Sequence, residues 1–234
     1  EMSASLVGSE MCIRDRKKVI KKESEKMGFF QNTCKPEGFG GKLMVKMMNI
    51  GHGKLAGWGF SKISANDDAR VLDAGCGGGA NIAIWLDKCK KGLVTGLDYS
   101  EVSVNEARKV NRSAIQEKRC EVMRGNVAQM PFPEDTFDWV SAFETIYFWP
   151  GLEKCFAEVY RVLKKGGTFM ICNESDGTNA ADEKWIKIID GMRIYDEKTI
   201  CKALEAAGFA SIVCHAEKEK HCLCIWRRNN YGGI

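Results

Sequence analysis

Residues 71–79 read Val-Leu-Asp-Ala-Gly-Cys-Gly-Gly-Gly, and this stretch decides the fold of the chain. The apolar run at its start predicts a buried parallel strand. The glycines leave the backbone open, because a side chain at Gly75, Gly77 or Gly79 would hold a ligand away from the N–H groups and from the next helix. The stretch therefore predicts a loop that approaches a nucleotide-like ligand. The alternative is a strand-to-helix turn that binds nothing.

A second apolar run, residues 92–98, ends in an acid and strengthens this interpretation. Asp98 follows Asp73 by 25 positions. An acid at the end of the second strand of such a unit can accept hydrogen bonds from both hydroxyls of a ribose. The glycine loop and the acid together favour a ligand that contains a nucleoside.

Strands alternate with helices along the rest of the chain, which is typical of an α/β protein. Apolar periodicity predicts helices at 81–89, 102–111, 152–163, 180–191 and 197–207, and strands at 121–124, 139–143, 168–172, 210–215 and 222–227. Residues 41–60 predict two short helices broken at Gly51-His52-Gly53. The predicted fold class is α/β, with a doubly wound, Rossmann-like, seven-stranded, mostly parallel sheet, a C-terminal antiparallel hairpin and an N-terminal helical cap.

Four sequence landmarks in this order resemble the class I S-adenosylmethionine (SAM) dependent methyltransferases. The first is Asp73 followed by the spacing G-x-G-x-G, and the others are residues 125–132, 137–140 and 158–168. The resemblance covers roughly residues 69–226 and is greatest to the small-molecule and quinone-type branch, called methyltransferase type 11. One departure is Asn126, where the family often has Asp; an amide can also hydrogen-bond an adenine edge.

The resemblance implies that SAM is the cofactor and S-adenosylhomocysteine the product. It assigns the methionine end of SAM to the glycine loop, the ribose to Asp98, and one adenine face to Tyr99, for which surface packing is the alternative. The full set of implied cofactor-binding residues is Asp73, Ala74, Gly75, Cys76, Gly77, Gly79, Asp98, Tyr99, Asn126, Val127, Ala128 and Phe143.

Residues 144–150 follow the fourth predicted strand, where this fold exposes residues beside the transferable methyl group. We predict that Glu144 and Tyr147 are catalytic, with Glu144 as a base or hydrogen-bond acceptor, and that Trp149 contacts the acceptor. The alternative is that the aromatic residues pack against the next helix. A base is needed when the acceptor is protonated at the working pH.

Three further acceptor-side assignments come from the helical cap and from the end of the fifth strand. His52, between two glycines, is a candidate base, although a loop histidine can also be structural or solvated. Trp58 is a candidate substrate contact, with core packing as its alternative. Asn173 and Glu174 follow the fifth strand and are predicted either to contact the acceptor or to lie in a solvated loop.

The predicted function is in-line methyl transfer from SAM to a small molecule, because correct positioning of two reactants supplies much of the rate. The acceptor atom (O, N, S or C) stays open, and so does the oligomeric state. The alternatives are a catalytically silent SAM-binding regulatory or partner subunit, aminopropyl transfer from a decarboxylated donor, and an arsenite-type enzyme that uses Cys34 and Cys172.

Composition limits the other functions. The formal net charge is +4, with much of the positive charge in residues 14–26 and no basic stripe interleaved with aromatic residues, so nucleic acid is not an expected partner. The 11 cysteines lack a Cys-x-x-Cys pair, which predicts reduced thiols, a cytoplasmic location and no metal site. No apolar run reaches the roughly 18 residues of a membrane span.

Four segments are expected along the chain. Residues 1–26 are predicted to be a non-native or disordered extension, because residues 5–16 resemble sequencing-adapter read-through and Met27 is a candidate native start. Residues 27–66 are the helical cap or lid, and residues 67–228 are the SAM-binding domain. Residues 229–234 are a disordered tail.

Overall fold

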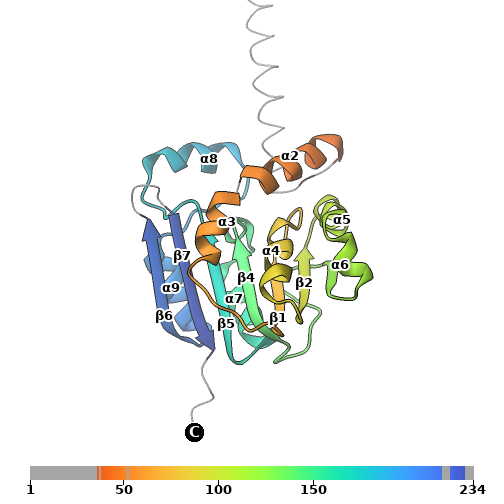
Figure 1. Cartoon of the computed structure of the whole chain (residues 1–234). Coiled ribbons are helices and arrows are strands. Elements are labelled where there is room, and N and C mark those ends of the chain that lie inside the picture. Colours follow the sequence, from red (N-terminus) through yellow and green to blue (C-terminus); the bar gives the residue numbers. More distant parts are fainter. Residues whose placement is uncertain (1–35, 37, 52, 218–221, 230–234) are drawn as a thin grey trace, which may run out of the picture.

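A seven-stranded sheet organises the computed structural model, which describes residues 36, 38–51, 53–217 and 222–229 (Figure 1). The strand order is β3-β2-β1-β4-β5-β7-β6, and β7 runs antiparallel to both neighbours, β5 and β6. The strands are β1 (Arg70–Ala74), β2 (Leu93–Asp98), β3 (Cys120–Arg124), β4 (Phe137–Phe143), β5 (Leu163–Asn173), β6 (Phe209–Glu217) and β7 (Cys222–Asn229). The predicted fold class, with its C-terminal hairpin, is confirmed.

Helices cover both faces of the sheet. They are α2 (Gly38–Gly51), α3 (Gly53–Phe60), α4 (Ala80–Lys88), α5 (Glu101–Val110), α6 (Arg112–Gln116), α7 (Leu152–Val162), α8 (Glu183–Ile188) and α9 (Glu197–Ala206), with 3₁₀ turns at Ile146–Phe148 and Ala180–Asp182. One apolar cluster joins α7 and α9 to one face, and another joins α3, α4 and α5 to the other. Figure 1 shows α2 and α8 over one end of the sheet.

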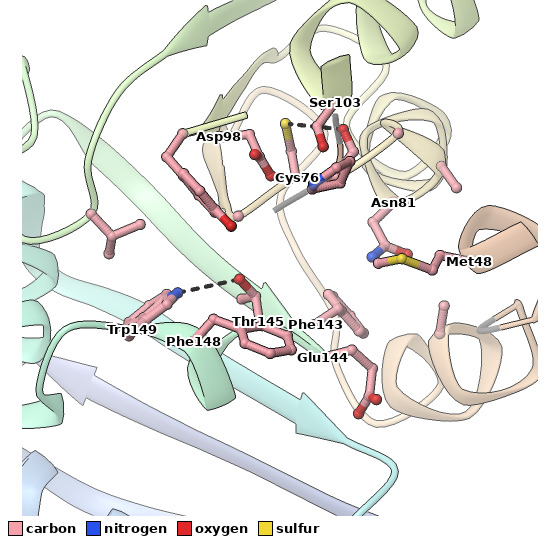
Figure 2. Close-up of a pocket in the computed structure, with 18 of the residues that line it drawn as sticks. Met48, Cys76, Asn81, Asp98, Ser103, Phe143, Glu144, Thr145, Phe148 and Trp149 are labelled. Carbon is pink, nitrogen blue, oxygen red and sulfur yellow. Dashed lines mark hydrogen bonds between the residues drawn. The ribbon is translucent and has the colours of Figure 1, made fainter. Parts of the chain in front are cut away.

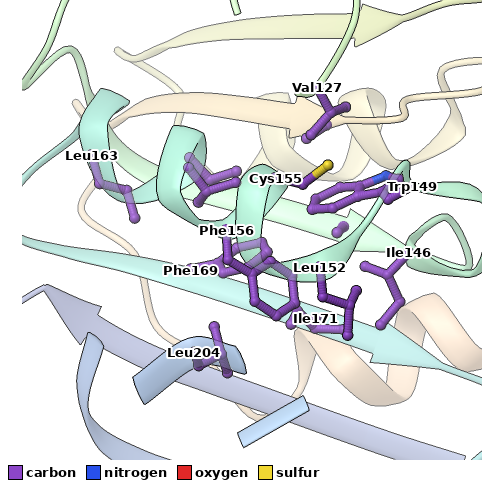
Figure 3. Packing of buried hydrophobic residues seen from close by; sticks show 14 of the residues in the cluster. Val127, Ile146, Trp149, Leu152, Cys155, Phe156, Leu163, Phe169, Ile171 and Leu204 are labelled. Atoms are coloured by element: carbon purple, nitrogen blue, oxygen red, sulfur yellow. The ribbon is translucent and has the colours of Figure 1, made fainter. Parts of the chain in front are cut away.

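The amphipathic helix α7 fixes the chain that leaves β4. Its buried Phe156 lies against Phe169 of β5, with ring centroids 5.4 Å apart, and Trp149 stacks on the same ring at 6.2 Å (Figure 3). Ile146 is also fully buried in this cluster. Ile146 and Trp149 therefore anchor the segment after β4 between the sheet and α7.

The structure corrects several predicted element boundaries. Strand β5 begins at Leu163, because the segment predicted as a glycine turn, Lys164–Gly167, continues the strand past a register shift opposite β4. The single helix predicted over 180–191 is a 3₁₀ turn followed by the short α8. Helix α6 was not expected; Asn111 ends α5 and donates its side-chain amide to Gly79 and Ala107 oxygens, both at 3.0 Å.

Candidate active site

The loop after β1 is tied to the end of β2 by its own backbone. The N–H groups of Gly75 and Cys76 both donate to the Leu97 oxygen, at 2.7 and 3.0 Å, and the Gly77 N–H donates to Asp98 Oδ2 at 2.9 Å. The other oxygen of Asp98 accepts from the Ser100 N–H at 2.8 Å. The acid predicted to hold a ribose therefore also anchors the glycine loop.

Two glycines of this loop have a positive φ but different surroundings. Gly75 has a φ of +79°, and a Cβ there would lie 2.0 Å from the hydroxyl oxygen of Thr145. Gly77 has a φ of +50°, and a Cβ there would meet no atom within 4 Å among the described residues. Gly77 therefore faces open space, where the backbone can approach a ligand.

Asp73 lies beneath this loop and is held by a buried chain of two hydrogen bonds. The Trp85 indole donates to Ser141 Oγ at 2.9 Å, and Ser141 donates to Asp73 Oδ1 at 2.8 Å. Within the described chain, Asp73 Oδ2 has no hydrogen-bond partner. Burial raises the pKa of Asp73 to about 7, and the nearby Asp98 charge adds to this rise. The free oxygen is an orphaned acceptor that a bound cation or donor would satisfy.

A first cavity of about 350 Å³ opens above the loop (Figure 2). Predicted cofactor residues that line it are Gly75, Cys76, Gly77, Asp98, Tyr99, Asn126, Val127 and Phe143. Three other predicted residues, Ala74, Gly79 and Ala128, do not line it, and neither does Asp73. Tyr99 is 43% exposed, and the side-chain oxygen of Asn126 accepts from the Ala128 N–H at 2.9 Å.

Several residues of the first cavity were missed by the sequence prediction. Met48, Ala56, Asn81 and Ser103 come from the helices around the loop. Thr145 and Phe148 lie within the predicted stretch 144–150 but were not assigned a role of their own. The helical residues carry only the apolar or polar character common to any helix, so no signal in the sequence marks them. Thr145 lay next to a predicted residue, and its role becomes visible only through its contact with Gly75.

A second cavity, of about 760 Å³, adjoins the first. Met48 and Glu144 line both cavities. Its apolar wall consists of Met44, Met48, Leu55, Trp58, Trp185, Ile189, Met192 and Ile194, and its polar part of Lys54, Glu144, Tyr147, Glu174, Ser175, Asp182, Glu217 and Cys222. The wall residues from α8 and beyond were not predicted.

Glu144 lies at the junction of the two cavities in an unusual backbone conformation. Its φ is +55°, which costs a non-glycine residue about 1–3 kcal/mol and is found preferentially at functional sites. Its carboxylate accepts from the Tyr147 hydroxyl at 3.0 Å and from the Glu174 N–H. The hydroxyl of Tyr147 in turn accepts from the Ser175 N–H at 3.1 Å. Two donors thus hold the Glu144 carboxylate, and one of them, the Tyr147 hydroxyl, is itself positioned by Ser175.

The surroundings of Glu144 favour its neutral form. Protein encloses the carboxyl group although it borders the cavities, and this burial raises its pKa to about 8. The nearby charges of Glu174 and Asp182 act in the same direction, whereas the hydrogen bonds from Glu174 and Tyr147 oppose it. Burial also raises the pKa of the Tyr147 hydroxyl well above its usual value. Glu144 therefore titrates near neutral pH, where a general base works best.

The remaining predicted site residues fall in different places. Trp58 and Glu174 line the second cavity, whereas Trp149 lines the first and donates its indole N–H to Thr145 Oγ1 at 3.3 Å. Asn173 is fully buried, lines neither cavity, and has no partner for either side-chain amide atom within the described residues. His52 lies outside the described residues.

The structure also bears on the two cysteines considered for an arsenite-type site and on membrane-spanning helices. Cys172 is fully buried beneath α3 and lines neither cavity, and Cys34 lies outside the described residues. In the part of the chain that the structure describes, none of the helices combines the length and the apolar character needed to cross a bilayer.

Comparison with protein families gives one match. Residues 72–171 match the family described as "Methyltransferase domain". This range contains the glycine loop, Asp98 and Glu144 and ends within β5.

The chain is also similar to curated proteins whose names describe methyltransferases of sterols or of cycloartenol. It is 35% identical to a cycloartenol-C-24-methyltransferase of Arabidopsis thaliana over 61% of this chain and 45% of that protein. It is 30% identical to a sterol 24-C-methyltransferase of Candida albicans over 63% of this chain and 42% of that protein. The chain thus matches less than half of the length of these relatives.

Solved structures share the fold. A Haloferax volcanii complex of the Trm112 methyltransferase activator with a methyltransferase aligns with a TM-score of 0.72 and 20% identity, covering 80% of this chain and 94% of that one. A geranyl diphosphate C-methyltransferase of Streptomyces coelicolor, in complex with S-adenosyl-L-homocysteine, aligns with a TM-score of 0.62 and 15% identity, covering 75% of each chain. At these identities the likeness concerns the fold alone.

Proposed function

We propose that this chain, whose residues 72–171 match the methyltransferase domain family, transfers the methyl group of SAM to a largely apolar small molecule in the second cavity. The observation that carries the proposal is the junction of two cavities at Met48 and Glu144. A cofactor site and an acceptor site must adjoin for direct transfer, because reacting atoms have to come within about 3–3.5 Å of each other.

The residues of the first cavity fit SAM. Its volume of about 350 Å³ is in the range of small-ligand sites. Gly77 offers a backbone without steric obstruction, and Asp98 retains lone pairs for ribose hydroxyls beyond its two backbone contacts. Asp73 does not line this cavity, but it lies beneath the glycine loop, and its ionised form there would favour the positively charged methionine end. When bound, SAM supplies a methyl group already activated by a positively charged sulfur.

The second cavity suits an apolar acceptor with a polar or charge-developing part. Two tryptophans, Trp58 and Trp185, and several aliphatic side chains form most of its wall, and its volume of about 760 Å³ accommodates a molecule of several fused rings. The names of the relatives favour a sterol-like compound and a carbon as the acceptor atom. Its acids are Glu144, Glu174 and Asp182, with Glu217 from the edge strand β6.

Glu144 is the proposed proton acceptor. An uncharged carbon or hydroxyl that receives a methyl group must lose a proton, and Glu144 borders both cavities with a pKa of about 8. Tyr147 and the Glu174 N–H hold the carboxylate in place. Glu174 and Asp182 add negative charge that favours positive charge developing on the acceptor.

Isotope-labelled SAM with cycloartenol as the first acceptor probe tests the proposal. Glu144→Gln keeps the shape and both hydrogen bonds but removes the base, so we expect turnover to fall by about 10²–10⁴-fold with unchanged SAM affinity. Glu153→Gln, an exposed position on α7, is the matched control. Equal turnover of wild type and Glu144→Gln would exclude Glu144 as the base. SAM binding without label transfer to cycloartenol or to other apolar acceptors would favour a silent SAM-binding subunit.

A further inference from the structure

Three potential metal ligands gather at the far edge of the sheet, away from both cavities. Glu197 and Cys201 lie on α9, and Cys214 lies on the adjacent strand β6 (Figure 1). One donor atom from each of these side chains lies within 4.8 Å of the donor atoms of the other two. None of the three residues lines either cavity. The group therefore has no part in the proposed methyl transfer.

The secondary structure presents these donors together. Glu197 and Cys201 are four residues apart on a ten-residue helix, so their side chains project from the same face, one turn apart. The thiols of Cys201 and Cys214 are partly buried against the core beneath α9, and Glu197 is exposed at the rim. This arrangement gives two fixed sulfur donors and one adjustable oxygen donor.

The spacing suits a tetrahedral ion. Zinc–sulfur and zinc–oxygen bonds of about 2.3 and 2.0–2.2 Å place neighbouring ligand atoms about 3.5–3.8 Å apart. Donor atoms that already lie within 4.8 Å of each other need to move by about 1 Å to reach that separation, which side-chain rotation can supply. Neither cysteine is in a disulfide.

We propose that Glu197, Cys201 and Cys214 bind a zinc-like divalent cation that joins α9 to the edge strand β6, with water as the fourth ligand. Two thiolates and a carboxylate are a donor set that zinc prefers over magnesium or calcium, which take oxygen ligands. The absence of a Cys-x-x-Cys pair, which predicted no metal site, does not bear on this group, because its ligands come from a helical i, i+4 pair and a separate strand.

Cobalt titration of the whole, reduced chain tests the proposal. We expect sulfur-to-cobalt charge-transfer absorption that saturates at one cobalt per chain and disappears on addition of zinc. Cys201→Ser combined with Cys214→Ser should abolish it. Glu197→Gln, at an exposed position that does not endanger folding, should weaken cobalt binding by about tenfold or more. The matched control is Cys222→Ser, a partly buried cysteine on neighbouring β7, which should leave the signal unchanged.

Three results would overturn the proposal. The first is no charge-transfer band in the wild type, and the second is a band that persists in the double cysteine variant, which would mean adventitious binding at other thiols. The third is a disulfide between Cys201 and Cys214. In air it would lower the mass of the wild type by two hydrogens and leave the mass of Cys214→Ser unchanged, and the wild type would show no cobalt band after reduction. Unchanged cobalt affinity of Glu197→Gln would remove the carboxylate from the site.

Discussion

The first cavity takes much of its wall from loops that leave parallel strands, whereas the second takes its apolar wall from side chains of α2, α3 and α8 and of the segment that follows α8. Gly75, Gly77 and Asp98 act through backbone conformation and backbone hydrogen bonds. Trp58 and Trp185 act through the surface of their rings, and they come from helices far apart in the sequence. The two cavities share the functional segment after β4, where Glu144 borders both.

This difference indicates which cavity determines the specificity for the methyl acceptor. A cavity made of strand ends and glycines can hold one chemical shape, because its backbone cannot change without disturbing the sheet. A cavity made of helix side chains can be reshaped one residue at a time while the sheet stays intact. Substitutions in the first cavity should therefore abolish cofactor binding or stability, and those in the second should change the acceptor.

Asp98→Ala should have the largest effect, because it removes the proposed ribose contacts and the observed anchor of the Gly77 N–H together. Two hydrogen bonds to a charged group, at about 1.5–3 kcal/mol each, correspond to a loss of SAM affinity of more than about 100-fold. Calorimetric titration with SAM measures it. The matched control is Asp67→Ala, a surface acid paired with Lys91 at 3.0 Å, which should bind SAM like the wild type. Retained affinity in Asp98→Ala would show that the ribose assignment is wrong.

Gly75→Ala should destabilise the fold itself. The added Cβ would lie 2.0 Å from Thr145 Oγ1, and alanine is disfavoured at a φ of +79°. Backbone strain of about 1–3 kcal/mol and overpacking of about 1–3 kcal/mol together predict a decrease in the free energy of unfolding of roughly 2–6 kcal/mol. Urea unfolding measures the difference. Gly57→Ala, in α3 with no atom within 4 Å of the new Cβ, is the control, and it should not lower stability. Equal stability of wild type and Gly75→Ala would mean that the Thr145 contact is not rigid.

The same contrast explains what the sequence could predict. The glycine loop and Asp98 are encoded in short contiguous stretches with strong local preferences, so the fold class was predictable, and with it the part of the first cavity that these stretches form. Glu144 was found because it follows a strand, where this fold exposes residues. The acceptor wall from Trp185 to Ile194 was not found, because its apolar residues look like the buried face of any helix. Their role depends on where α8 lies over the sheet, which is a tertiary property.

Trp185→Ala should change the acceptor and leave SAM binding intact. Loss of a buried aromatic contact of about 1.5–3 kcal/mol predicts a rise in the KM for an apolar acceptor of about 10–100-fold, with unchanged SAM affinity. The control is Ile186→Ala, the neighbouring residue on α8, which is 45% exposed and does not line the cavity. An equal effect of both substitutions would mean that α8 acts through its stability and not through contact with the acceptor.

The pH dependence of stability distinguishes two acids of the site, Glu144 and Asp73. The pKa of Glu144 is about 8 in the folded chain against 4.5 for an ordinary glutamate, so between these values the folded chain holds a proton that the unfolded chain releases. The free energy of unfolding must therefore fall as the pH rises through this window, by at most about 1.4 kcal/mol per pH unit for one group. Asp73, with a pKa of about 7 against 3.8, contributes a slope of the same sign that ends about one pH unit lower.

Urea unfolding of Glu144→Gln and Asp73→Asn between pH 5 and 8.5 separates the two contributions. Glu144→Gln should flatten the decline most between about pH 7.5 and 8.5, where Asp73 is largely ionised in both states, and Asp73→Asn should flatten it mainly below about pH 7.5. Glu153→Gln should keep the full slope of the wild type, because its side chain is exposed. If Glu144→Gln kept the decline above pH 7, the carboxyl group at the junction would be ionised throughout. It would then accept hydrogen bonds at neutral pH, but it would not titrate in the range where a base for the acceptor has to work.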